Sequence, residues 1–196
     1  MTDRLKDENT PAYLAPLVGY RSRKAAQICA KFANLNGGII DKLKVIKLVY
    51  FAERQFLADH HLPMLFDEFY SLPHGPICSS TLNGLDGLLH KEVWNEFLQR
   101  DGRDKIVSMK KFERDELDEI SDAELIAIEK VWGELGKYSA WEIRDYSHDK
   151  CPEYTLVTEG RLPISYREVL AAMGEEDAEA VEREISDFRR LEGAMG

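Results

Sequence analysis

The sequence predicts an α+β fold that is predominantly α-helical, with about six or seven helices and a small antiparallel β-hairpin or sheet. Two observations predict the helices. Apolar residues recur at helical spacing in several segments, and Ser-x-x-Glu capping boxes precede two of these segments, at Ser121 and Ser139. A third observation predicts strands, because an Asp-Gly turn signal at residues 101–102 lies between two short apolar segments. The chain has 196 residues, which favours a single domain.

The first third of the chain is expected to form an irregular arm followed by two helices. Residues 1–19 contain two prolines and no sustained periodicity. A helix is predicted from Ser22, a favourable N-cap, to the Gly-Gly pair at 37–38. A second helix follows Asp41, which can cap it, and Pro63 ends it. Apolar residues cover a wide arc of this second helix, so we expect it to be central in the fold.

The middle of the chain is expected to alternate between short strands and one helix. Residues 68–72 alternate like a strand, and the Pro-His-Gly-Pro sequence at 73–76 forces a turn. Helical spacing of leucines predicts a helix over 77–90. The segments 94–98 and 105–109 flank the Asp-Gly signal and are predicted as the two strands of a hairpin.

The last part of the chain is expected to be helical. Each capping box begins a helix, and the second helix includes Trp141 among its apolar residues. A short helix is predicted from Ser165 to Gly174. The stretch 175–191 is amphipathic and carries an acidic outer face. These boundaries divide the chain into an N-terminal arm (1–19), a main domain (20–174) and an acidic C-terminal helical extension (175–196).

Composition excludes several classes of protein. No apolar run approaches the length needed to span a bilayer, and the first residues carry charges of both signs instead of the apolar centre of a signal peptide. The three cysteines are odd in number and widely spaced, which argues against a disulfide framework. We therefore expect a cytoplasmic protein that has no contact with a membrane.

Charge is distributed unevenly along the chain. The net charge is −10, and the excess of acidic residues lies after residue 98. Residues 20–54, in contrast, carry eight basic and two acidic side chains. The acidic average makes nucleic acid an unlikely partner, although a regulator that binds nucleic acid through its basic first helices is a third interpretation. The alternative for this basic run is pairing with the acidic second half of the same chain.

Three segments in a fixed order resemble one family. They are the helix segment 43–52, the strand and turn 68–77, and the second capping box with its helix start, 139–143. Together they resemble the Panacea domain of the SocA-like antitoxins of bacteria and phages, over roughly residues 22–170. On this resemblance the main domain is a Panacea/SocA-like domain. The chain departs from many relatives after Pro152, where Glu153-Tyr154 stands in place of a tryptophan.

The resemblance implies a function in toxin–antitoxin systems. Members of the family neutralise a cognate protein toxin by binding it directly. In the SocA branch the antitoxin also serves as a proteolytic adaptor that presents the toxin to the ClpXP protease. The expected partners are therefore a toxin and, in the adaptor case, ClpXP. No enzymatic activity and no cofactor are expected, and the oligomeric state is left open.

Candidate contacts with the partner lie in three places: the second helix, the turn after the first strand, and the acidic C-terminal helix. The residues are Lys44, Lys47, His74, Gly75, Pro76, Val181, Ile185 and Phe188. The acidic outer face of the last helix suits a basic toxin. Its apolar stripe can pack either on its own core or on a partner helix.

The alternative from a different class is a zinc- or histidine-dependent hydrolase. Such an enzyme would use His74, Cys78 and His148, and with Cys151 these residues make a set that zinc accepts in tetrahedral geometry. The spacing His-x3-Cys and His-x2-Cys carries little specificity, since both pairs adjoin turns or helix ends. No phosphate-binding loop, nucleophile elbow or dinucleotide-binding sequence is present.

Overall fold

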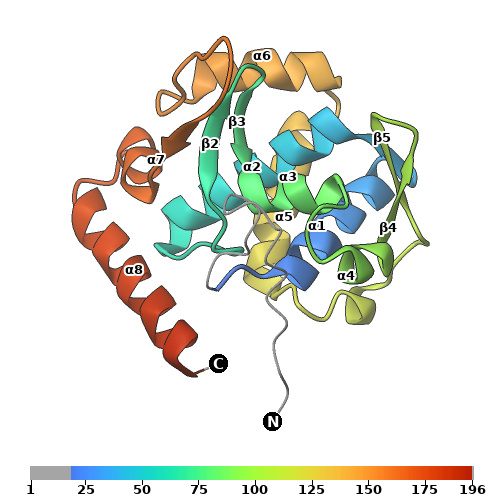
Figure 1. Ribbon diagram of the computed structural model, residues 1–196, viewed down its shortest axis with the longest axis horizontal. Coiled ribbons are helices and arrows are strands. Elements are labelled where there is room, and N and C mark those ends of the chain that lie inside the picture. The colour runs from blue at the N-terminus through green and yellow to red at the C-terminus, as the bar shows by residue number, and fades with distance from the viewer. Residues whose placement is uncertain (1–18, 196) are drawn as a thin grey trace.

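The computed structural model describes residues 19–195, with side chains up to residue 191. Within this part of the chain lie eight α-helices and two three-stranded antiparallel sheets, which confirms the predicted helix-dominated α+β class (Figure 1). The helix beyond the predicted six or seven is α4 (Lys91–Asn95). The predicted irregular arm 1–19 lies outside the described residues except for its last residue.

The remaining helices are α1 (Ser22–Leu35), α2 (Lys42–His60), α3 (Ser79–Leu85), α5 (Asp122–Leu135), α6 (Ala140–Lys150), α7 (Tyr166–Ala172) and α8 (Ala178–Met195). The strands are β1 (Ile39–Asp41), β2 (Phe69–Leu72), β3 (Gly75–Cys78), β4 (Leu98–Asp101), β5 (Lys105–Ser108) and β6 (Leu162–Ile164). A 3₁₀ turn, η2 (Arg114–Glu116), precedes α5.

Helix α2 is the centre of the fold, as its wide apolar arc predicted. It contacts α1, α3, α5, α6 and α7 as well as β1 and β3, and it lies behind the β2–β3 hairpin in Figure 1. The side chains of Leu48, Val49 and Ala52 are fully buried. The predicted N-cap is confirmed, because the Asp41 carboxylate accepts a hydrogen bond from the Leu43 amide at 3.1 Å.

The first sheet has the strand order β3-β2-β6. The predicted turn is tighter than expected: Pro73 and His74 connect the strands, and Gly75 already begins β3. Pro76, which cannot donate to a ladder, is tolerated because β3 is an edge strand. The predicted helix over 77–90 was therefore wrong at both ends, since Ile77 belongs to β3 and α3 ends at Leu85.

The second sheet has the order β1-β5-β4 and contains the predicted hairpin. The Asp-Gly turn is in the expected place, with Gly102 at φ +67°. The first strand was predicted too early, because Trp94 belongs to α4. Its indole Nε1 donates to the Ser22 hydroxyl at 3.0 Å, and its ring lies where a Cβ on Gly84 would be. Tertiary packing of one aromatic ring thus overrides the local strand pattern.

Capping boxes begin three of the later helices. The predicted boxes at Ser121 and Ser139 are present, each with its hydroxyl accepting from the third amide of the helix and its glutamate accepting from the serine amide. A third box, Ser165 with Glu168, begins α7. Each satisfies amides that a helix start leaves without a partner.

Helix α8 forms one side of the molecule and packs mainly on α7 (Figure 1). It begins three residues later than the predicted start at residue 175. Its side chains Ala178, Val181 and Ile185 are buried. Among the described residues, no helix combines the length and the apolar character that crossing a membrane requires.

Candidate functional site

A hollow of about 480 Å³ lies beside the turn between β2 and β3. Its walls come from the start of α2, this turn, the β4–β5 turn and the start of α6, and we call it the turn groove. The residues that define it are Leu43, Ile46, Lys47, Leu72, His74, Gly75, Arg103 and Trp141. Two of the three segments that resemble the Panacea domain provide the turn and Trp141, and the third provides α2. The structure therefore brings all three together at one surface.

The rim of the turn groove carries two exposed rings. The Trp141 side chain is 56% exposed, although its position in the sequence suggested an apolar packing role. The imidazole of His74 meets it edge to face, with ring centroids 5.7 Å apart. The guanidinium of Arg144 covers Trp141 at 4.9 Å from the ring centroid. An exposed indole held between two side chains is a typical anchor for a protein partner.

Gly75 fixes the turn against α6. Its φ is +92°, and a Cβ there would lie 2.5 Å from the Ser147 hydroxyl and 2.8 Å from the Lys47 amine. Both the backbone conformation and the space therefore require glycine. The turn and α6 consequently form one rigid wall of the turn groove.

Lys47, predicted as a contact with the partner, lies at the base of this wall and is fully buried. Its Nζ donates to the Pro76 carbonyl at 2.7 Å, the one hydrogen bond found for this amine among the described residues. Burial is the main cause that lowers the Lys47 pKa to about 7, and the nearby Arg144 acts in the same direction. Lys47 and Pro76 therefore hold β3 on α2 and present no surface to a partner.

Lys44, the other predicted contact on α2, is also buried. Its Nζ donates to the Gly136 carbonyl at 2.6 Å and to the Asn36 side chain at 3.0 Å. The amine also lies 5.2 Å from the centre of the Trp132 ring. Burial lowers the Lys44 pKa, against the opposing effect of Asp41. A cation in this position satisfies the carbonyl end of α5.

The basic run of residues 20–54 is largely paired within the chain. Five of its cations contact carboxylates: Arg23 with Glu96, Lys24 with Glu124, Lys31 with Glu129, Lys42 with Asp86, and Arg54 with Glu153. In three of these pairs, those of Lys24, Lys42 and Arg54, both side chains are shielded from solvent and at most 27% exposed. The interpretation that this run pairs with acidic residues of its own chain is therefore the one that the geometry supports.

The segment after α6 is held by Glu153 and Tyr154, the two residues at which the chain departs from many relatives. The Glu153 carboxylate is buried and accepts from the Tyr50 hydroxyl at 2.7 Å and from Arg54 Nε at 2.6 Å. The next residue, Tyr154, stacks on His148 with centroids 4.7 Å apart and donates to the Leu72 carbonyl at 3.0 Å. These contacts join the end of α6 to α2 and to the turn groove.

The residues of the hydrolase alternative are dispersed. His74 is exposed on the turn, whereas Cys78 is buried at the end of β3 and His148 lies beneath Gly75. Burial raises the Cys78 pKa well above its usual range, so its thiol is protonated. The part of the chain that the structure describes contains no group of three or more His, Cys, Asp or Glu side chains placed to hold a metal ion.

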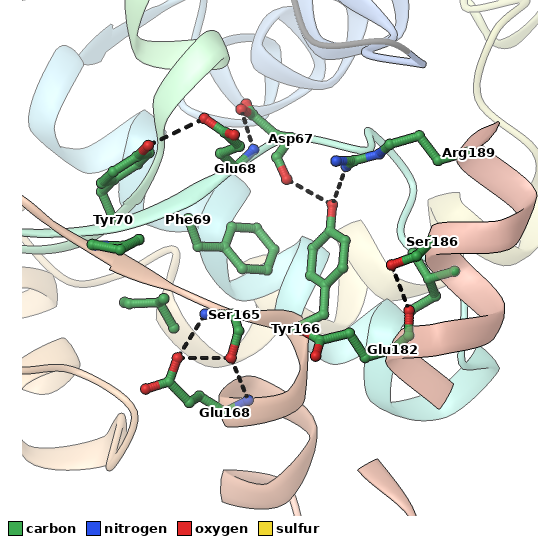
Figure 2. A pocket seen from close by; sticks show the side chains of 13 residues that line it. Asp67, Glu68, Phe69, Tyr70, Ser165, Tyr166, Glu168, Glu182, Ser186 and Arg189 are labelled. Carbon is green, nitrogen blue, oxygen red and sulfur yellow. Dashed lines mark hydrogen bonds between the residues drawn. The ribbon is translucent and has the colours of Figure 1, made fainter. Parts of the chain in front are cut away.

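A second hollow, of about 310 Å³, lies between β2, α7 and α8 (Figure 2). The predicted apolar stripe of α8 packs beside it: Val181 and Ile185 are buried on the chain's own core. Phe188 is 40% exposed and stacks on Phe66 with centroids 5.6 Å apart. A partner would reach the first two residues only if α8 left this position.

Comparison with known proteins identifies the family. The family model described as "Antitoxin SocA-like, Panacea domain" matches residues 45–153, which is more than half of the chain. The search of curated proteins gave no match, and neither did the search of solved structures. The matched range contains most of the turn groove, including Lys47, His74, Gly75 and Trp141. The chain therefore belongs to the SocA-like antitoxin family and contains its Panacea domain.

Proposed function

We propose that this protein neutralises a cognate protein toxin by direct stoichiometric binding, and that the turn groove is part of the contact surface. The observation that carries the proposal is the family match, whose range includes the β2–β3 turn and the start of α6. A binding protein needs no catalytic group, and we assign none. The proposed place of action is the bacterial cytoplasm.

The physical character of the turn groove supports a role in binding. Protein interfaces derive most of their affinity from a few aromatic anchors in preorganised surroundings. Trp141 and His74 provide exposed rings, and the close contact at Gly75 holds the turn on which His74 lies. Apolar side chains of α2, Leu43 and Ile46, line the adjoining hollow. A protruding apolar side chain of the toxin would therefore bind with little loss of conformational freedom.

The predicted contact residues take different parts in this proposal. His74 and Gly75 line the turn groove and remain candidate contacts. Lys47 and Pro76 act from beneath it, because their mutual hydrogen bond shapes the turn. Lys44 acts further away, at the end of α5.

Presentation of the toxin to ClpXP is the second part of the proposal. The family resemblance supports it, since the SocA branch works in this way. In a cell that contains ClpXP, the toxin would then be degraded faster when this protein is present. In a strain without ClpX the half-life of the toxin would no longer depend on this protein.

The test is to express the protein encoded by the adjacent open reading frame alone and together with this protein. Growth arrest by the neighbour alone, relieved by this protein, is the expected result. A neighbour that is harmless alone, or that stays toxic when both proteins are made, would overturn the proposal.

A matched pair of variants tests the turn groove. Trp141→Ala is expected to weaken co-purification of the toxin by at least about tenfold, which corresponds to the loss of an interface anchor. Ile126→Ala is the control, because Ile126 is another exposed apolar side chain, 68% exposed, on α5 and outside the turn groove. Equal affinities of the two variants for the toxin would remove the turn groove from the contact surface.

A further inference from the structure

The hollow between β2, α7 and α8 has aromatic walls. Phe69 and Tyr70 come from β2, and Tyr166 comes from the first turn of α7 (Figure 2). The Tyr166 hydroxyl donates to the Asp67 carbonyl at 2.6 Å and accepts from Arg189 at 3.0 Å. These bonds fix the ring in place. We call this hollow the α8 pocket.

The α8 pocket lies mainly outside the range that matches the family. Residues 163–189 provide most of its lining, whereas the match ends at residue 153. The pocket is thus built mainly by residues that follow the matched range. Such a pocket is suited to distinguishing one partner from another.

Carboxylates dominate the charge of the α8 pocket. Glu68, Glu168 and Glu182 line it, and the first two are exposed. Among the described residues, Glu68 accepts from the Tyr70 hydroxyl, Glu168 from the Ser165 cap and Glu182 from the Arg167 amide. A carboxylate has about four acceptor positions, so each can accept further hydrogen bonds. The fourth carboxylate, Asp67, is buried and is committed to amides and the hydroxyl at the start of α3.

The outer surface of α8 extends this acidic character. The carboxylates around its first turns are Glu175, Glu176, Asp177, Glu179, Glu184 and Asp187. Of the three arginines of the helix, Arg190 contacts Asp187 and Arg189 turns inward to Phe66 and Tyr166. A cationic partner would be attracted to this side of the molecule before contact.

Two rings of the α8 pocket already hold guanidinium groups of the chain itself. Arg161 of the chain itself lies over the Tyr70 ring at 4.4 Å from its centroid, and Arg189 lies 5.7 Å from that of Tyr166. Aromatic faces of this kind attract cations.

We propose that the α8 pocket binds an arginine or lysine side chain of a basic segment of the partner protein. The carboxylates of Glu68 and Glu182, which line the pocket, supply the negative charge that holds the cation. The inference rests on the proposed function in taking the toxin as this partner, and it adds a second contact surface that selects a basic toxin.

A labelled short peptide of alternating Arg and Gly serves as the first probe, with fluorescence anisotropy as the readout and a Glu–Gly peptide as the negative control. The test variant is Glu68→Gln/Glu182→Gln, which removes two charges and keeps the acceptors for Tyr70 and Arg167. The matched control is Glu179→Gln/Glu184→Gln, which removes two charges from the exposed surface of α8 outside the pocket. Thermal unfolding monitored by circular dichroism confirms that both variants are folded.

The pocket variant is expected to bind the Arg–Gly peptide at least about tenfold more weakly than the wild type, since hydrogen bonds to charged groups are lost. The control variant is expected to lose only the small effect of long-range attraction. Equal losses in the two variants would show general charge attraction without a site and would overturn the inference. Binding of the Glu–Gly peptide as tightly as the Arg–Gly peptide would also overturn it.

Growth assays with the neighbouring protein separate this inference from the proposed function. If the wild type relieves toxicity and the pocket variant does so only at higher expression, both stand. If both relieve toxicity equally, the inference fails and the proposed function remains. If the wild type itself gives no relief, the proposed function fails, and the peptide titration alone then decides whether the pocket binds cations.

Discussion

The buried amine of Lys47 makes the stability of the fold depend on pH in a defined window. The Lys47 pKa falls from 10.5 in the unfolded chain to about 7 in the fold because burial disfavours the charged form. Between these two values the unfolded chain holds a proton on this lysine that the folded chain has released. Raising the pH through this window therefore favours folding, and the unfavourable contribution of Lys47 is fully present only below pH 7.

The magnitude follows from the same two pKa values. Their separation corresponds to about 5 kcal/mol of destabilisation at low pH, from ~1.4 kcal/mol for each pH unit. The destabilisation that Lys47 causes is then about 4 kcal/mol at pH 7 and about 2 kcal/mol at pH 9. The free energy of unfolding of the wild type should thus rise, relative to Lys47→Met, by about 2 kcal/mol between these two pH values.

Urea unfolding of the wild type and Lys47→Met at pH 7 and pH 9 measures this difference. Comparing two variants at each pH cancels the contributions of other groups, such as Glu53, whose pKa burial raises to about 8. Lys31→Met is the matched control, because Lys31 forms an exposed ion pair with Glu129. If the difference between the wild type and Lys47→Met is the same at both pH values, Lys47 keeps its charge in the fold and the reasoning is refuted.

Three further predictions concern packing, ion pairing and thiol access. Gly75→Ala should lower the free energy of unfolding by about 3 kcal/mol, because strain at positive φ is added to a steric clash. Gly102 has open space around it, so Gly102→Ala should lower this free energy by only about 1 kcal/mol. Urea titrations of both variants measure the difference. Arg54→Met should lower the free energy of unfolding by about 3–5 kcal/mol at pH 7, since it leaves the buried Glu153 carboxylate without its cation. A decrease below about 1 kcal/mol would show that Glu153 has become hydrated. All three cysteine thiols are buried, so they should react with Ellman's reagent only as fast as the chain unfolds, and a fast-reacting thiol in native buffer would contradict this burial.

The features that the sequence predicted correctly depend on interactions over short distances along the chain. The capping boxes at Ser121 and Ser139 involve residues three positions apart, and the Asp41 cap acts two positions ahead. The Asp-Gly turn likewise determines its own conformation. Local rules were sufficient in these places because no distant group competes for the same atoms.

The features that were missed depend on partners far away in the sequence. β1 and β6 are three residues long and exist only because β5 and β2 offer free edges for pairing. Helix α4 replaces a predicted strand because the Trp94 ring fits against Gly84 of α3. Neither kind of contact leaves a periodic pattern in the sequence.

The candidate site was predicted in part. The turn with His74 and Gly75 was singled out, and it does line the turn groove. The position of Lys47 between the core residues Ile46 and Leu48 suited an internal salt bridge and an interface contact equally well, and the structure shows its side chain fully buried. The exposure of Trp141 was missed because a capping box determines where a helix begins but not which of its faces meets the core.

The ion pairs between the basic first helices and the later carboxylates have a consequence for synthesis of the protein. Lys24 pairs with Glu124, one hundred residues later, and Arg54 pairs with Glu153, ninety-nine residues later. During translation the cationic α1 and α2 therefore emerge long before their counterions exist, next to ribosomal RNA that attracts them. The fold cannot close until α6 and the segment after it have left the exit tunnel. The protein can therefore complete its fold only when almost all of its chain has been made.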